Sequence, residues 1–125
     1  MQLFDRMDWS RLQHEYGVDA KRLLPWPGVT PPFGGAWVVV APHSVSLAHV
    51  NEPADEEEFF VCCAGRARVC HGDAVRDVAA GDVAYFPPGV RHWIENPHDE
   101  PCHLYCLWWN HGSVTRCLEA RSQTA

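Results

Sequence analysis

The chain contains 125 residues, enough for one domain with one hydrophobic core. Its formal net charge of −6 argues against a nucleic-acid-binding protein, because such proteins usually carry a basic surface. No apolar run approaches the roughly 20 residues that a bilayer-spanning helix needs, and the N-terminal stretch lacks the apolar block of a signal peptide. We therefore expect a cytoplasmic protein that does not contact a membrane.

Turn residues divide the chain into short segments. Residues 5–24 are predicted to form a short helical segment, and the proline-rich residues 25–35 a stiff connector. Strands are expected at 36–41, 44–51, 59–65, 66–78 (a hairpin), 83–86, 92–96 and 102–109. We divide the chain into an N-terminal lead-in with its connector (1–33), a barrel (34–112) and a C-terminal tail (113–125) that is a short helix or a frayed end. Regular turn signals between short strands predict an all-β sandwich or barrel.

Six cysteines are present, and none forms a Cys-x-x-Cys pair. Several fall inside apolar strand patterns, so in a cytoplasmic chain they are expected to be reduced and to pack as small apolar side chains. The alternative is that one of them lines a pocket. The six are Cys62, Cys63, Cys70, Cys102, Cys106 and Cys117.

The stretch GDVAYFPPGVRHWIEN, residues 81–96, predicts a strand, a tight turn and a second strand. Two prolines and a glycine form the turn, and His92 follows it at the start of the second strand. A rigid turn of this kind holds an imidazole in a fixed position.

A second stretch, HVNEPADEEEFFVCCAG, could supply partners for His92. His49 and Asn51 are two residues apart and share a strand face. Glu58, at the start of the next strand, can face the same interior. Two imidazoles and a carboxylate suit a divalent transition metal with open coordination positions. Glu56 or Glu57 could replace Glu58, and His43 could also be recruited.

Together these stretches resemble the two motifs of the cupins, small β-barrels of the double-stranded β-helix type. Gly81, Pro87, Gly89, His92 and Asn96 match the second motif at every position. In the first motif Asn51 replaces a histidine, and the gap from Asn51 to Glu58 is two residues too long. The resemblance implies a cupin jelly-roll barrel preceded by a short helical segment. It also implies a metal held by His49, Glu58 and His92, with Asn51 or water completing the coordination.

Further side chains are candidates for a pocket inside such a barrel. Tyr105, His103 and Glu57 could move protons. Arg66 or Arg68 could bind a substrate carboxylate. Phe60 and Trp37 are also expected to contact a substrate.

A narrower resemblance links the chain to the zinc cupins of bacterial hydrazine synthetases, on the segments PFGGAWVVVAP, EEEFFV, GRARV and LWW together with residues 81–96. It implies N–N bond formation in a biosynthetic pathway, starting from an ester of an N-hydroxylated amine that a separate synthetase-like partner prepares. Zinc is the expected ion and iron(II) the next. Two alternatives stay open: an iron-dependent dioxygenase or an isomerase or lyase, and a non-catalytic ligand-binding or sensor cupin. The apolar stretch 36–41, taken as a sheet edge, and an outward tryptophan suggest a homodimer.

Overall fold

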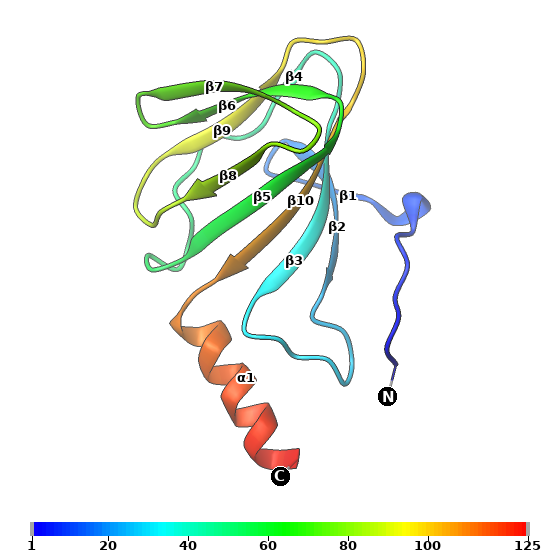
Figure 1. Cartoon of the computed structure of the whole chain (residues 1–125), viewed down its shortest axis with the longest axis vertical. Coiled ribbons are helices and arrows are strands. Elements are labelled where there is room, and N and C mark those ends of the chain that lie inside the picture. Colours follow the sequence, from blue (N-terminus) through cyan, green and yellow to red (C-terminus); the bar gives the residue numbers. More distant parts are fainter. Residues whose placement is uncertain (1, 125) are drawn as a thin grey trace.

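The computed structural model describes residues 2–124 and consists mainly of two antiparallel sheets packed face to face (Figure 1). In spatial order, the larger sheet contains β1 (Gln13–Glu15), β2 (Val18–Leu24), β3 (Gly34–Val40), β10 (Cys102–Trp109), β5 (Glu57–Ala64) and β8 (Val83–Phe86). The smaller sheet contains β4 (Ser44–Val45), β9 (His92–Asn96), β6 (Arg66–His71) and β7 (Ala74–Ala79). A 3-10 turn, η1 (Trp9–Arg11), and one helix, α1 (His111–Thr124), complete the fold.

This arrangement confirms the predicted all-β fold of the jelly-roll type. Within residues 2–124 no strand ladder joins the two sheets, so they form an open sandwich rather than a closed barrel. The hydrophobic core lies between them, because alternate residues of each strand point inward. Phe60 of β5 and Phe86 of β8 are completely buried there, with ring centroids 5.5 Å apart.

The helical lead-in predicted for residues 5–24 is wrong. Only η1 is helical in that segment, and β1 and β2 form a hairpin that extends the larger sheet. Tyr16 and Gly17 form its two-residue loop with φ angles of 52° and 74°, the left-handed conformation that tight hairpins favour. Val18 and Ala20 are buried on alternate positions, a period-two pattern that the helical interpretation overlooked.

The segment expected to be a free sheet edge, residues 36–41, lies instead in the middle of a sheet. Strand β3 pairs with β2 on one side and with β10 on the other. Backbone pairing through these residues therefore cannot join two copies of the chain, and a homodimer stays a prediction.

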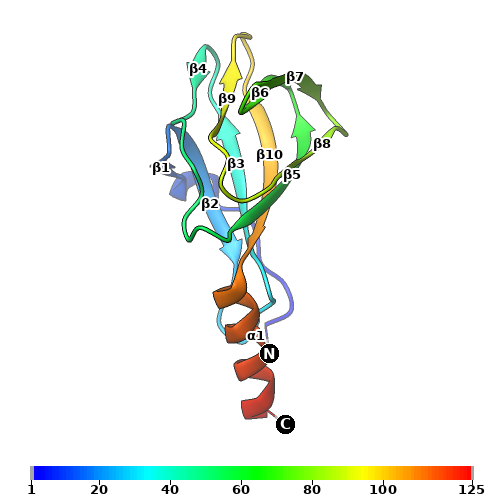
Figure 2. The ribbon, with the colours of Figure 1, turned by 90° about the vertical axis from the view of Figure 1, so that its left-hand side faces the viewer.

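The C-terminal tail forms a regular helix, α1, which projects from one end of the sandwich (Figures 1 and 2). Asn110 caps it: the amide oxygen of Asn110 accepts a hydrogen bond from the Ser113 backbone, and the Ser113 hydroxyl accepts one from the Asn110 backbone. Among the described residues no helix has the length and hydrophobicity needed to cross a membrane.

All six cysteines are free, as predicted, and all except Cys63 are buried. The sulfur atoms of Cys62 and Cys102 lie 3.8 Å apart in the core and share a hydrogen bond, without a disulfide between them. Cys106, on β10, lines the pocket described below.

Candidate functional site

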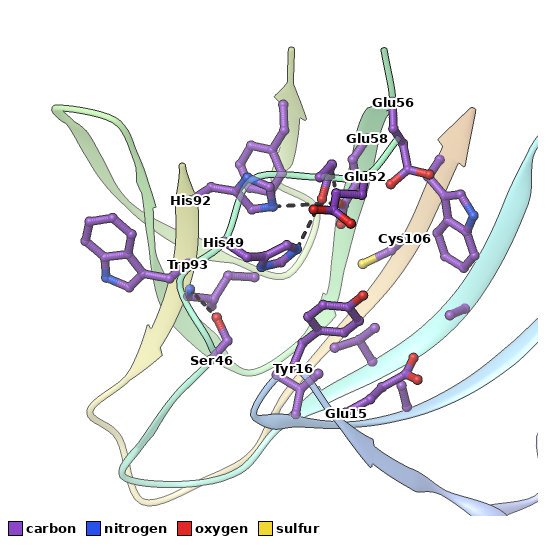
Figure 3. A pocket seen from close by; sticks show the side chains of 18 of the residues that line it. Glu15, Tyr16, Ser46, His49, Glu52, Glu56, Glu58, His92, Trp93 and Cys106 are labelled. Carbon is purple, nitrogen blue, oxygen red and sulfur yellow. Dashed lines mark hydrogen bonds and ion pairs between the residues drawn. The ribbon is translucent and has the colours of Figure 1, made fainter. Parts of the chain in front are cut away.

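A pocket of about 400 Å³ lies between the two sheets, next to the hydrophobic core. Figure 3 shows its polar side chains: His49 and His92 stand together, with Glu58 and Cys106 nearby and the Tyr16 ring next to His49. Apolar side chains of both sheets complete the wall, namely Val18, Ala20, Ala36, Val38, Phe86 and Ile94.

Backbone pairing brings the two histidines together from distant parts of the sequence. His92 begins β9 after the predicted turn, in which Gly89 adopts a φ angle of 82° that other residues rarely tolerate. The segment before β5 runs alongside, and His49 and His92 exchange backbone hydrogen bonds of 3.2 and 3.0 Å. Their ring centroids are consequently 4.7 Å apart.

Each imidazole is oriented by a backbone carbonyl. Nδ1 of His49 donates to the carbonyl of Leu47 at 3.0 Å, and Nδ1 of His92 donates to the carbonyl of Val90 at 3.1 Å. In a neutral imidazole this leaves Nε2 without a proton. Both Nε2 atoms can therefore act as electron-pair donors to a ligand in the pocket.

Asn51 and Glu58 complete the polar group. The Asn51 amide nitrogen donates to Glu58 Oε2 at 3.1 Å, which leaves the Asn51 amide oxygen 3.1 Å from His49 Nε2. Glu58 Oε2 is also 3.7 Å from His92 Nε2. Lone pairs of two imidazoles, one amide and one carboxylate thus converge in a small space, where a proton, a bound cation or the hydrogen-bond donors of a ligand can satisfy them.

Burial sets the charge state of these groups. The side chain of His92 is only 5% exposed, and its burial lowers its pKa, so the neutral imidazole is favoured at neutral pH. Burial also raises the pKa of the Glu58 carboxyl, while the hydrogen bond from Asn51 opposes this shift. The pocket therefore pairs a neutral imidazole with a carboxylate that benefits from a nearby positive charge.

The donor set fits a divalent cation. Two ligands about 2.1 Å from one ion lie about 3.0 to 3.4 Å apart at right-angled to tetrahedral geometry. The 3.1 Å between His49 Nε2 and the Asn51 oxygen falls in this range, and the 3.7 Å between His92 and Glu58 is slightly wider. Considering histidine, cysteine, aspartate and glutamate alone, no group of three within residues 2–124 is placed to hold a metal. A cation bound here would therefore also need the Asn51 amide, water or a small shift of the side chains.

The residues predicted to move protons lie elsewhere. Glu57, His103 and Tyr105 occupy strand positions whose side chains point to the outer face of the larger sheet. Glu57 accepts hydrogen bonds from Tyr85 and Trp109 on that face. His103 accepts one from Trp37 Nε1 at 2.9 Å, so Trp37, predicted to contact substrate, also faces outward.

The remaining predicted residues are also outside the pocket. Arg66 lies 3.8 Å from Glu100, and Arg68 contacts Asp77 and Glu95, so both arginines form ion pairs away from the pocket. Phe60 is part of the core and does not line the pocket.

Of the residues considered as substitutes for Glu58, Glu56 does line the pocket. Burial raises the pKa of its carboxyl, and a hydrogen bond from Asn110 opposes that rise. His43 instead bonds Asp99 at 2.6 Å and does not line the pocket.

Sequence reasoning missed the contribution of the β1–β2 hairpin to the pocket. Glu15, Tyr16 and Arg22 all line it. The Tyr16 ring packs on His49 with centroids 4.7 Å apart, and Arg22 reaches Glu15 at 3.1 Å. The Tyr16–Gly17 pair followed by alternating apolar residues was the available signal, because two-residue hairpins favour such turns.

The cupin domain model matches residues 36–108 of the chain. Two solved structures are similar over nearly the whole chain. The plu4264 protein from Photorhabdus luminescens is 34% identical with a TM-score of 0.90, covering 98% of this chain and 99% of its own. A cupin 2 conserved barrel domain protein from Salinispora arenicola is 39% identical with a TM-score of 0.83, covering 93% and 95%.

A more distant structure shares the fold alone. It is described as a predicted oxalate decarboxylase from Thermotoga maritima, at 22% identity and a TM-score of 0.65, covering 74% of this chain and 79% of its own. No protein of curated function matches the chain. The family match covers more than half of the chain, and both closely similar structures exceed 30% identity, so this protein belongs to the cupin family.

Proposed function

We propose that this cupin is a metal-dependent enzyme that acts on a small polar molecule in the pocket between its sheets. His49, His92, Glu58 and Asn51 would hold a divalent cation, zinc in the first place and iron(II) as the next choice. The observation that carries the proposal is the convergence of their acceptor atoms, with both imidazoles oriented by backbone carbonyls. His49, His92 and Glu58 would be the stronger ligands, and a substrate oxygen could displace the weaker Asn51 amide or take a fifth position on the ion, as in catalytic zinc sites.

A bound divalent cation would supply Lewis-acid polarisation of a carbonyl or hydroxyl oxygen. The protein's own residues supply the remaining functions. Leu47 and Val90 hold the imidazoles in position through their carbonyls, and Asn51 orients the Glu58 carboxylate. Glu56 lies at the pocket wall with a raised pKa, which suits a group that accepts a proton from a substrate.

The specific reaction that we propose is N–N bond formation, the chemistry implied by the resemblance to hydrazine synthetase cupins. An amine nitrogen of one substrate part would attack the nitrogen of an N-hydroxylated amine whose oxygen is esterified to an amino acid. The N–N bond forms as the N–O bond breaks, the departing carboxylate takes the electron pair, and the ammonium proton passes to a carboxylate such as Glu56. A separate synthetase-like partner would supply the ester. Glu56 and the other acidic side chains of the pocket support this choice of reaction, because their negative charges attract an amine substrate.

The metal content of untagged protein tests the proposal. Near-stoichiometric zinc that is lost in His92→Ala but retained in His111→Ala, an exposed histidine outside the pocket, would support it and justify assays with hydroxylamine esters. Iron would direct the assays to oxygen-dependent chemistry. Failure of the wild-type protein to bind zinc or iron after either is added would overturn the metalloenzyme and leave a ligand-binding cupin.

A further inference from the structure

We infer that the pocket selects a cationic, amine-bearing ligand over an anion of the same size. The inference rests on the proposed function in that it concerns the same pocket. Its basis is the charge of the wall: four carboxylates line the pocket, and Arg22 is the one lysine or arginine among the described lining residues. The carboxylates belong to Glu15, Glu52, Glu56 and Glu58.

The guanidinium of Arg22 is already engaged. Its Nη2 atom is 3.1 Å from a carboxylate oxygen of Glu15, and its central carbon lies 5.1 Å from the centroid of the Trp108 ring. An incoming anion would have to compete with Glu15 for this group. Arg22 therefore neutralises the wall locally and offers little to a substrate carboxylate or phosphate.

The remaining charge is negative even with a metal bound. With neutral histidines, four carboxylates and one guanidinium leave a net charge of −3 on the lining side chains, and a divalent cation would reduce this to −1. Glu58 belongs to the metal-binding group, and Glu15 is paired with Arg22. Glu52 and Glu56 are left to face a ligand.

These two carboxylates lie across the pocket from Tyr16 and Glu15 (Figure 3). Glu52 is exposed and forms no ion pair with residues 2–124, whereas Glu56 is half-buried and accepts a hydrogen bond from Asn110. A protonated amine in the pocket would be attracted by these carboxylates, and an anion would be repelled by them.

The apolar part of the wall strengthens this selection. Val18, Val38, Phe86 and Ile94 line the pocket beside the charged groups. A cleft with low-dielectric walls and charges of one sign focuses the electric field and concentrates ligands of the opposite sign. The same side chains offer a surface for a short hydrocarbon chain, so the ligand class is an ammonium group on a small aliphatic body.

Three probes of matched length and different charge test the inference: 1,4-diaminobutane, 1,4-butanediol and succinate. Their binding would be measured by calorimetry at pH 7, with metal-free and with zinc-loaded protein. We expect the diamine to bind at least about 10-fold more tightly than succinate in both forms, with the diol between them, and to weaken as salt is added. Equal or tighter binding of succinate by either form would overturn the inference.

Variants test whether the named carboxylates are responsible. Glu52→Gln and Glu56→Gln should each weaken diamine binding about 2- to 5-fold while leaving the diol unchanged. Glu119→Gln, an exposed acid on α1 outside the pocket, is the matched control and should have no effect. Unchanged diamine binding in both pocket variants would also overturn the inference.

A parallel zinc titration separates the two proposals. Failure to bind zinc, and also iron(II) in a second titration, would overturn the metalloenzyme, whereas binding to the metal-free protein would still decide the charge selection. Zinc binding combined with a preference for succinate would leave the proposed metal site standing and overturn the selection for cationic ligands.

Discussion

The carboxylates of Glu57 and Glu58 lie on opposite faces of β5, although the two residues are adjacent in the sequence. Glu58 accepts a hydrogen bond from Asn51 inside the pocket, and Glu57 accepts one from Trp109 Nε1 on the outer face at 2.7 Å. Successive side chains of a strand point to opposite sides, so a shift of one residue in the pairing would exchange their positions. The pairing of Glu58 with Trp108 and Phe86 sets this register.

These neighbours make a matched pair of variants. Glu58→Gln should weaken zinc binding at least about 10-fold, because it replaces a charged ligand with a neutral one. Glu57→Gln should leave zinc binding unchanged. Competition against a zinc-chelating dye measures both, and equal losses in the two variants would refute the assignment of Glu58 as the ligand.

Asn51 is expected to matter for metal binding although the family motif has histidine there. Its amide contacts both His49 and Glu58. Asn51→Ala should therefore lower zinc affinity by about 10- to 100-fold, the usual cost of removing a group that orients metal ligands. Asn51→His, which restores the motif, should keep or raise the affinity. If the alanine variant binds zinc as tightly as the wild type, Asn51 neither binds the metal nor orients its ligands.

The hairpin that carries Tyr16 depends on Gly17. A Cβ atom at Gly17, where φ is +74°, would lie 2.9 Å from the backbone nitrogen of Leu47. Gly17→Val should destabilise the protein by about 1 to 3 kcal/mol, since it combines a strained conformation with a backbone clash. Urea denaturation measures this cost. Gly28→Val is the control for the clash. The φ angle is also positive at Gly28, but a Cβ atom there meets nothing within 4 Å, so this variant should show the cost of the strained conformation alone.

The thiols should differ sharply in reactivity. Burial raises the pKa of Cys102 to about 12 and that of Cys106 well above its usual value, so both stay protonated between pH 7 and pH 9. Cys63 is exposed. We expect native protein to react with iodoacetamide at Cys63 alone across this range, and at all six cysteines after unfolding. Mass spectrometry of the alkylated peptides identifies the sites, and rapid labelling of Cys106 would show that the pocket opens more widely.

Phe60 is expected to stabilise the fold rather than bind substrate. Its side chain is completely buried and packs against Phe86. Phe60→Ala should cost about 3 to 5 kcal/mol of unfolding free energy, because it leaves a cavity in the core. Phe60→Leu should cost less and leave zinc affinity at the wild-type value. A large loss of zinc affinity in a folded Phe60→Leu protein would contradict this role.

The sequence by itself determined those features that depend on local periodicity and spacing. Residues 81–96 specified a strand, a rigid turn and His92 at the start of the next strand, because proline and glycine restrict the backbone wherever they occur. The two-residue separation of His49 and Asn51 likewise predicted that they could share a face, and their side chains do lie within hydrogen-bonding distance.

Tertiary structure decided what local patterns leave open. Residues 18–24 form a strand rather than a helix because the hairpin pairs with β3, and a short amphipathic segment takes its conformation from such partners. That pairing brought Tyr16 and Arg22 to the pocket. Tertiary structure also placed His103 and Tyr105 on the outer face. The alternation along β10 shows that these two side chains share a face. Only the backbone pairing of β10 with β3 and β5 decides whether that face points into the sandwich. Interactions between distant segments are set by the burial of the whole core, and no short stretch of sequence contains that information.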